Sequence, residues 1–86
     1  MPGTRVLIAD TEKLGQLIRL TRRFQHLRQD EVGRFSHSFI GEVEMGKSTA
    51  QIGKVFEALR ELGLKIHIEL PPGIPESAVQ ELSRPR

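Results

Sequence analysis

Residues 29–47 read QDEVGRFSHSFIGEVEMGK, and the class of fold is best inferred from this segment. Its pattern predicts a short helix over roughly residues 28–34 and another over roughly residues 36–45. Ser36 supplies a side-chain oxygen that can cap the second of these helices, and Gly46 suits the left-handed position just past its end. The residues of that helix that we expect at the core are Ile40, Val43 and, beside them, Phe39.

Further helices are predicted on either side of this stretch. Asp10 and Thr11 offer N-cap side chains for a helix that runs to about residue 25. Its apolar stripe consists of Leu14, Leu17, Ile18, Leu20 and Phe24. Downstream, Ser48 and Gln51 have the spacing of a capping box. The helix that follows ends at Gly63 and carries apolar residues at helical spacing, namely Ile52, Val55, Phe56, Leu59 and Leu62.

The period changes after Gly63. Apolar and polar residues alternate over residues 64–70, which predicts a half-buried strand whose inner face consists of Leu64, Ile66, Ile68 and Leu70. Within the chain the one candidate partner for this strand is the run Arg5–Ile8. A copy of the same strand from a second subunit is therefore the expected mate. Pro71 and Pro72 end the strand.

These patterns define a mainly α protein with four to five helices and one C-terminal β-strand that pairs across a homodimer. We divide it into an N-terminal arm (1–10), a helical domain (11–63), a dimerisation strand (64–70) and a flexible tail (71–86). A chain of 86 residues suits one domain, and a core shared between two subunits would strengthen it.

Composition narrows the classes of function. The chain has no cysteine, which excludes disulfides and thiolate metal sites. Its N-terminus has no signal-peptide pattern and no segment is long and apolar enough to span a bilayer, so we expect a cytoplasmic protein. Residues 1–54 hold nine Lys/Arg and six Asp/Glu, whereas residues 55–86 hold four and five. Five arginines between Arg19 and Arg34 could match a phosphate backbone, although a solvated helix face explains them equally well.

Residues 29–47 resemble a known sequence motif. Residues 29–33 (QDEVG) and 38–47 (SFIGEVEMGK) are similar to the Gln-Glu-Glu-Leu-Ala … Ile-Ser-x-Ile-Glu-x-Gly-Lys pattern of the XRE family of phage-repressor-like helix-turn-helix proteins. Upstream, Leu14-Gly15-x-x-Ile18-Arg19-x-x-Arg22 resembles the first helix of that family. The segment from Ile52 to Leu64, followed by a strand, is similar to the HipB-type antitoxin branch in particular.

The resemblance, which covers residues 12–70, implies a lambda-repressor-like domain that binds DNA. It places Ser36, His37, Ser38 and Glu42 at positions that face the major groove, where Glu42 would accept a hydrogen bond from a cytosine. It also implies that Gln29 contacts a phosphate and braces the next helix. The other residues expected at the DNA backbone are Lys47, Ser48 and Thr49, together with Arg19 and Arg28. Arg22 and Glu44 match a structural ion pair of the family.

The sequence departs from the family pattern in three ways, all of them between residues 26 and 40. The stretch from Gln29 to Ile40 is about three residues shorter than usual, so the second helix or the turn must be abbreviated. Arg28 stands where the family has a capping Ser or Thr. His26 stands where the family has the Gly that ends the first helix, so the first two helices could run together.

Two other kinds of site are conceivable from the sequence, a phosphate-binding loop and a metal site. Residues 41–48 (GEVEMGKS) have the spacing of a phosphate-binding P-loop, but Glu42 and Glu44 would repel a phosphate and no buried strand precedes them. A helix that ends at Gly46 explains the pattern better. His26, His37 and His67 lack metal-ligand spacing. We therefore expect no cofactor, no metal and no enzymatic activity.

By resemblance, the protein is expected to be an antitoxin. It would bind a palindromic operator as a homodimer, repress its own operon and bind a HipA-like kinase toxin. Two alternatives stay open, a stand-alone repressor of the same fold and a protein-interaction module without DNA binding.

Overall fold

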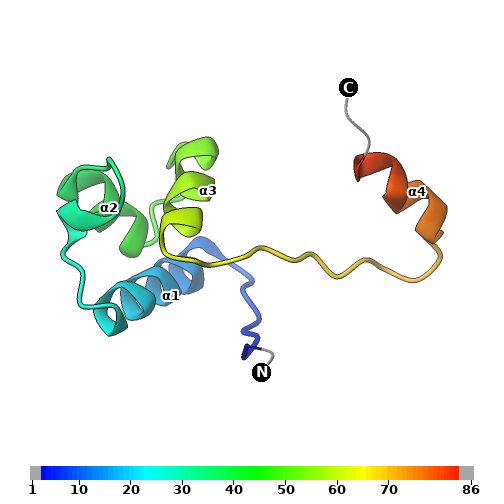
Figure 1. Cartoon of the computed structure of the whole chain (residues 1–86), viewed down its shortest axis with the longest axis horizontal. Helices are drawn as coiled ribbons and strands as arrows, with labels where there is room; N and C mark the ends of the chain where they lie inside the picture. The colour runs from blue at the N-terminus through cyan, green and yellow to red at the C-terminus, as the bar shows by residue number, and fades with distance from the viewer. Residues whose placement is uncertain (1–2, 84–86) are drawn as a thin grey trace.

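A computed structural model describes residues 3–83, in which four α-helices and two short 3₁₀-helices follow one another along the chain (Figure 1). In chain order they are α1 (Thr11–Phe24), η1 (Gln29–Glu31), α2 (His37–Glu44), α3 (Ile52–Glu61), α4 (Glu76–Gln80) and η2 (Glu81–Ser83). The mainly α class is therefore confirmed. The expected second helix is reduced to the single turn η1. Gly33 explains part of this shortening, because its left-handed φ of 56° stops a helix.

Two of the predicted N-caps are formed. The Asp10 carboxylate accepts a hydrogen bond from the backbone N–H of Lys13 at 2.8 Å, and the Ser36 hydroxyl accepts one from Phe39 at 3.1 Å. The predicted capping box of Ser48 and Gln51 is wrong, because α3 begins later. Residues 48–50 form a turn that brings Ala50 against the core, and Gln51 is an N-cap without a side-chain hydrogen bond.

The first three helices end in the same way. At each end a residue with positive φ donates its N–H to the carbonyl oxygen of the second-last helical residue, and the next residue donates to the carbonyl oxygen of the third-last, which is a Schellman motif. Gly46 and Gly63 take this position with φ values of 88° and 77°, as predicted. His26 takes it after α1 with a φ of 59°, which costs about 1 kcal/mol relative to glycine. The chain therefore turns after Phe24, and α1 does not continue into η1.

The core lies between α1, η1, α2 and α3. Its buried residues are Ile18, Val32, Ile40, Val43, Val55, Ala58, Leu59 and Leu62. Leu14 and Phe39 pack partly buried against it, in agreement with their predicted place. Four residues assigned to apolar helix faces lie largely outside the core instead, with exposed fractions of 41–78%: Leu20, Phe24, Ile52 and Phe56. α1 and α3 carry more apolar side chains than the neighbouring helices of this small domain can bury.

Gly15 sets the distance between α1 and α2. It is buried where the two helices cross, and a Cβ at this position would lie 2.6 Å from the carbonyl oxygen of Glu44 and even nearer that of Val43. Contacts between real atoms are longer than this, so no side chain fits without movement of the backbone. The close crossing places the end of α2 directly against the first half of α1.

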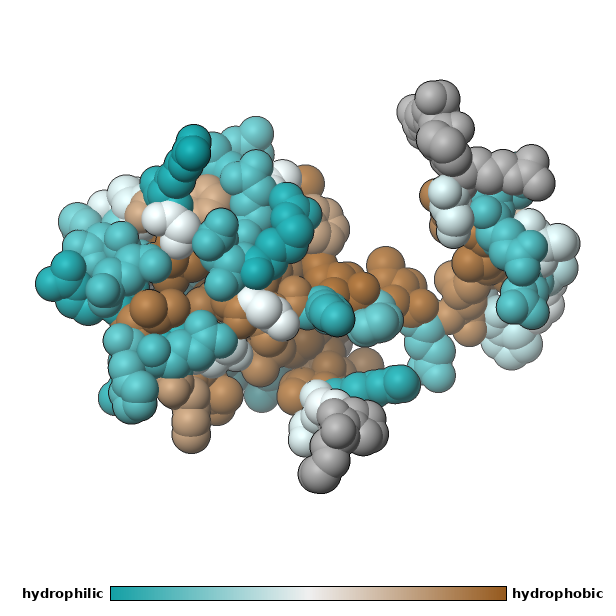
Figure 2. All heavy atoms as spheres, in the orientation of Figure 1, coloured by the Kyte–Doolittle hydropathy of each residue, from teal (hydrophilic) through white to brown (hydrophobic). Residues whose placement is uncertain are grey.

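The predicted strand over residues 64–70 does not form within a single chain. They run extended from the body (Figure 1), but no strand and no ladder forms anywhere in residues 3–83. A ladder needs a second backbone alongside, and the candidate Arg5–Ile8 does not pair with this segment. Leu64 packs on the core, whereas Ile66, Ile68 and Leu70 are 49%, 80% and 46% exposed. Figure 2 shows the apolar surface that continues along this extended segment.

The segment predicted to be a flexible tail contains secondary structure. Pro75 precedes α4, which the extended segment holds away from the helical body (Figure 1), and η2 follows directly. The outermost residues of the predicted arm and tail, 1–2 and 84–86, lie outside the described residues. Over residues 3–83, no helix has the length and apolar character needed to cross a membrane.

We predict that Gly15→Ala lowers the free energy of unfolding by about 1–3 kcal/mol, because α1 and α2 must separate to admit the new methyl group. Gly53 is the matched control. It lies within α3, and a Cβ there would meet no other part of the protein within 4 Å, so Gly53→Ala should raise stability by up to about 1 kcal/mol. Urea unfolding of both variants measures the difference, and equal stabilities would show that the crossing is not tight.

Candidate nucleic-acid interface

The first turn of α2 is presented to solvent. Ser36 caps the helix, and both His37 and Ser38 are exposed, while Ile40 two residues later is fully buried. This alternation arises because the helix rests on the core through one side only. A short helix with polar side chains on an exposed first turn is the element that helix-turn-helix proteins insert into the major groove.

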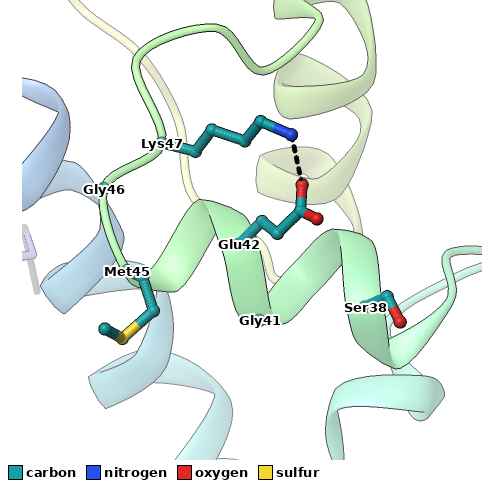
Figure 3. Close-up of a pocket in the computed structure, with 6 residues that line it drawn as sticks. All are labelled: Ser38, Gly41, Glu42, Met45, Gly46 and Lys47. Carbon is teal, nitrogen blue, oxygen red and sulfur yellow. Dashed lines mark hydrogen bonds and ion pairs between the residues drawn. The ribbon is translucent and has the colours of Figure 1, made fainter.

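A shallow hollow runs along the outer face of α2, which we define as Ser38, Gly41, Glu42 and Met45 (Figure 3). Gly46 and Lys47 complete its lining. The Lys47 ammonium lies 2.6 Å from Oε2 of Glu42, and both side chains are about half exposed. The hollow therefore combines a hydroxyl, an ion pair and the exposed thioether of Met45.

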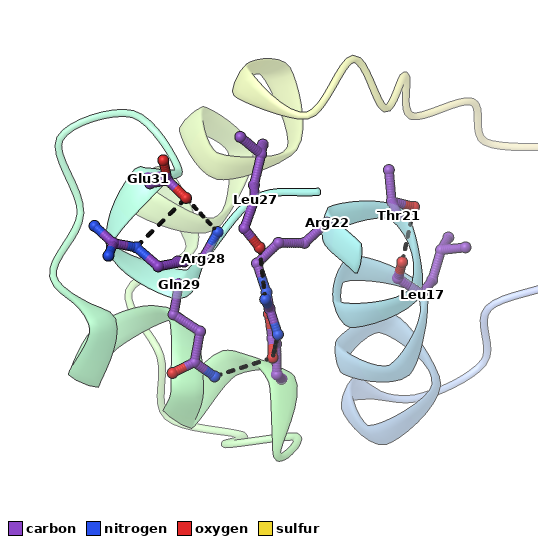
Figure 4. A network of polar contacts seen from close by, with 8 residues as sticks. Leu17, Thr21, Arg22, Leu27, Arg28, Gln29 and Glu31 are labelled. Carbon is purple, nitrogen blue, oxygen red and sulfur yellow. Dashed lines mark hydrogen bonds and ion pairs between the residues drawn. The ribbon is translucent and has the colours of Figure 1, made fainter. Parts of the chain in front are cut away.

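A buried ion pair holds α2 in place. Glu44 at the end of α2 accepts two hydrogen bonds from the Arg22 guanidinium of α1, at 2.6 Å and 3.0 Å, and their side chains are 4% and 11% exposed. The remaining guanidinium nitrogen, Nη1, donates to the Leu27 carbonyl oxygen at 2.8 Å, and the Gln29 side-chain amide donates to the Glu44 carboxylate at 3.1 Å (Figure 4). The predicted pair is confirmed, and it ties α1, the turn after it, η1 and α2 together.

Glu44 also affects the pKa of its partner, Arg22. Its hydrogen bonds raise the pKa of the Arg22 guanidinium, against the opposing effect of partial burial. A raised pKa in the folded state stabilises the fold at every pH below the pKa of the unfolded chain, and this contribution is lost only as pH rises through the higher folded value. The charge on Arg22 is therefore constant over the physiological range.

The other predicted DNA-binding residues lie in different settings. Gln29 is half buried and its amide is bonded to Glu44, which agrees with a bracing role. Arg28 is exposed and forms ion pairs with Asp30 at 3.2 Å and Glu31 at 3.5 Å, which offset part of its charge. The exposed residues Arg19, Ser48 and Thr49 do not line the hollow, and neither does Arg28.

Sequence reasoning missed several features of this surface. It did not anticipate that Met45 is 83% exposed, that the Leu27 carbonyl binds Arg22, or that Lys47 pairs with Glu42. The last could have been found, because a glycine at the end of a helix turns the next residue back over the preceding turn. Lys54 was also missed, and its ammonium lies 5.9 Å from the centre of the Phe39 ring.

The P-loop spacing has a structural explanation. Gly41 to Glu44 belong to α2, and the N–H of Met45 donates to the Gly41 carbonyl oxygen within that helix at 3.0 Å. These amides are therefore committed to the helix and do not form a loop around a phosphate. Across residues 3–83 no group of three or more His, Cys, Asp and Glu side chains is placed to hold a metal ion.

The single turn η1, the turn after it and the exposed helix α2 form the arrangement that is typical of helix-turn-helix proteins. The chain is 49% identical over 63 residues to an uncharacterized HTH-type transcriptional regulator, y4mF, of Sinorhizobium fredii, a similarity that covers 70% of this chain and 82% of that protein. No protein-family model matches it. The chain belongs to the family of HTH-type transcriptional regulators.

We predict that Glu44→Gln lowers the free energy of unfolding by about 3 kcal/mol, because Arg22 then remains buried without a counter-charge. Glu42→Gln is the matched control, since it breaks an ion pair of the same length at an exposed position and should cost less than about 1 kcal/mol. Urea denaturation measures both. A similar small loss in the two variants would mean that Glu44 does not hold the helices together.

Proposed function

We propose that this protein is a transcriptional repressor that binds duplex DNA as a homodimer and inserts the first turn of α2 into the major groove. The observation that carries this proposal is the outward position of His37 and Ser38 on a helix whose other side is fixed by the core and by the Arg22–Glu44 pair. A helix that reads bases must be rigid and exposed at the same time, and α2 combines both properties.

The chemistry of the first turn suits base recognition. His37 can donate a hydrogen bond to guanine, and the Ser38 hydroxyl can donate or accept. Ser36 faces the groove beside them, and residues around α2 contribute sequence-independent contacts to phosphates, in the proposed arrangement through Gln29, Ser48, Thr49, Arg19 and Arg28. Base contacts supply specificity, and the phosphate contacts supply much of the affinity.

The proposed dimer forms through residues 64–70. Ile66, Ile68 and Leu70 are substantially exposed on an extended segment whose backbone groups have no ladder partner within residues 3–83. A two-fold axis would pair this segment with its copy, satisfy one edge of each backbone and bury the alternate apolar side chains beside Leu64. Two α2 helices related by that axis match a palindromic operator.

A finer proposal is that the protein is the antitoxin of a HipA-like kinase toxin and represses their shared operon. It is supported by the similarity of residues 52–70 to the HipB branch. A stand-alone regulator is the alternative, supported by the name of the Sinorhizobium fredii relative, which mentions no toxin. Co-expression with the product of the adjacent gene separates the two, because an antitoxin co-purifies with that product and neutralises its toxicity.

The DNA-binding proposal predicts enrichment of a palindrome when the protein selects from a random duplex library. Affinity for that palindrome should exceed affinity for random duplex by about a thousandfold or more and should fall steeply with salt concentration. Ser38→Ala should reduce this preference, whereas Ser77→Ala in α4 should leave it unchanged. Equal affinity for all duplexes would contradict sequence-specific repression.

The dimer proposal predicts that Ile66→Asp and Ile68→Asp shift the protein toward monomer, because a buried carboxylate on the shared face lacks a partner. His67→Asp is the control, since alternation places it on the opposite face of the segment. Sedimentation equilibrium gives the mass of each variant. An unchanged dimer in both isoleucine variants would exclude pairing through this segment.

A further inference from the structure

Glu42 places a carboxylate on the face that the proposed function turns toward DNA. Its side chain is 53% exposed and lies with Ser38 on the outer face of α2, four residues further along the helix. DNA carries a dense line of negative phosphates, so an isolated carboxylate is repelled, and the repulsion grows as water is excluded from the interface. A DNA-reading surface that contains Glu42 therefore needs a way to neutralise it.

Lys47 meets this need through two bonds to the same residue. The Gly46 turn folds the chain back, so that the Lys47 backbone N–H donates to the Glu42 carbonyl oxygen at 3.1 Å. The Lys47 ammonium then lies 2.6 Å from Oε2 of Glu42 (Figure 3). The pair has no net charge, and its position follows from the turn that ends α2.

The geometry leaves Glu42 one oxygen for DNA. The ion pair uses Oε2, and Oε1 can accept a hydrogen bond from another donor. In the major groove the exocyclic amino group of cytosine is such a donor, and it is the base group with which Glu and Asp side chains characteristically pair. A carboxylate neutralised on one side can make this contact without a net negative charge.

We infer that Lys47 is a positioning residue that neutralises Glu42 and holds it toward the groove, and that Glu42 discriminates one C·G base pair in each half-site. The inference rests on the proposed function. It differs from the backbone-contact role that the family resemblance implies for Lys47, because here Lys47 acts through Glu42. Removal of Lys47 then exposes a repulsive charge in addition to deleting a positive one.

A double-mutant cycle separates the two roles. Kd is measured for a random-sequence duplex with the unmodified protein, Lys47→Met, Glu42→Gln and the double variant. We expect Lys47→Met to weaken binding about tenfold when Glu42 is present and about threefold when residue 42 is glutamine, which is a coupling of about threefold. An independent phosphate contact would lose the same factor in both backgrounds, and that result would overturn the inference.

Lys54→Met is the matched control for this cycle. The Lys54 ammonium lies near the Phe39 ring and pairs with no carboxylate in the described part of the chain. Its loss should weaken binding by the same factor with either residue at position 42. If Lys54→Met shows the same dependence on Glu42, the coupling comes from overall charge and not from the Lys47 pair. Circular dichroism of each variant verifies that the helices are retained.

Selection from a random duplex library tests the base contact itself. The unmodified protein should enrich cytosine at one position of each half-site, and Glu42→Gln should lose that preference while the other positions persist. An identical motif for both proteins would overturn the role of Glu42. Failure of the unmodified protein to bind any duplex would remove the proposed function and this inference together, whereas an enriched palindrome with an additive cycle would remove the inference alone.

Discussion

Glu44 is the charge around which the domain is organised. Its side chain is only 4% exposed, and a buried carboxylate is tolerated only when charged and polar partners surround it. Arg22 reaches it from α1 and Gln29 reaches it from η1, while the same arginine binds the carbonyl oxygen of Leu27. The need to satisfy one carboxylate therefore fixes four segments of a chain whose core contains only eight buried hydrophobic residues among those described.

The two ion pairs of α2 differ in burial and therefore in energy. Arg22–Glu44 and Lys47–Glu42 each have a closest contact of 2.6 Å, but the first is excluded from water and the second is about half exposed. The buried pair cannot exchange partners without a large loss of stability. The exposed pair is weak in water and can be reorganised when DNA approaches. One helix thus carries a rigid anchor on its inner side and an adjustable pair on its outer side.

The sequence was sufficient where local chemistry and a matched motif agreed. The residue types at helix ends predicted where helices begin and end, at Asp10, Ser36, Gly46 and Gly63, and the motif predicted the Arg22–Glu44 pair.

The sequence was insufficient where tertiary packing determines which residues are buried. Nothing in the periodicity of α1 distinguishes the buried Ile18 from the exposed Phe24, because the number of apolar residues exceeds what the neighbouring helices can cover. The strand over residues 64–70 could not be settled by the chain itself, since a ladder requires a second backbone.

In the proposed complex, the buried pair holds α2 so that its outer face meets DNA. Amide chemical-shift mapping tests this most directly, with isotopically labelled protein titrated by a palindromic duplex that it selects. We expect the largest shifts at residues 36–38, 41–42 and 47, while Arg22 and Glu44 keep their hydrogen bonds. Shifts concentrated on α4, or on the exposed side of α1 at Leu20 and Phe24, would contradict it.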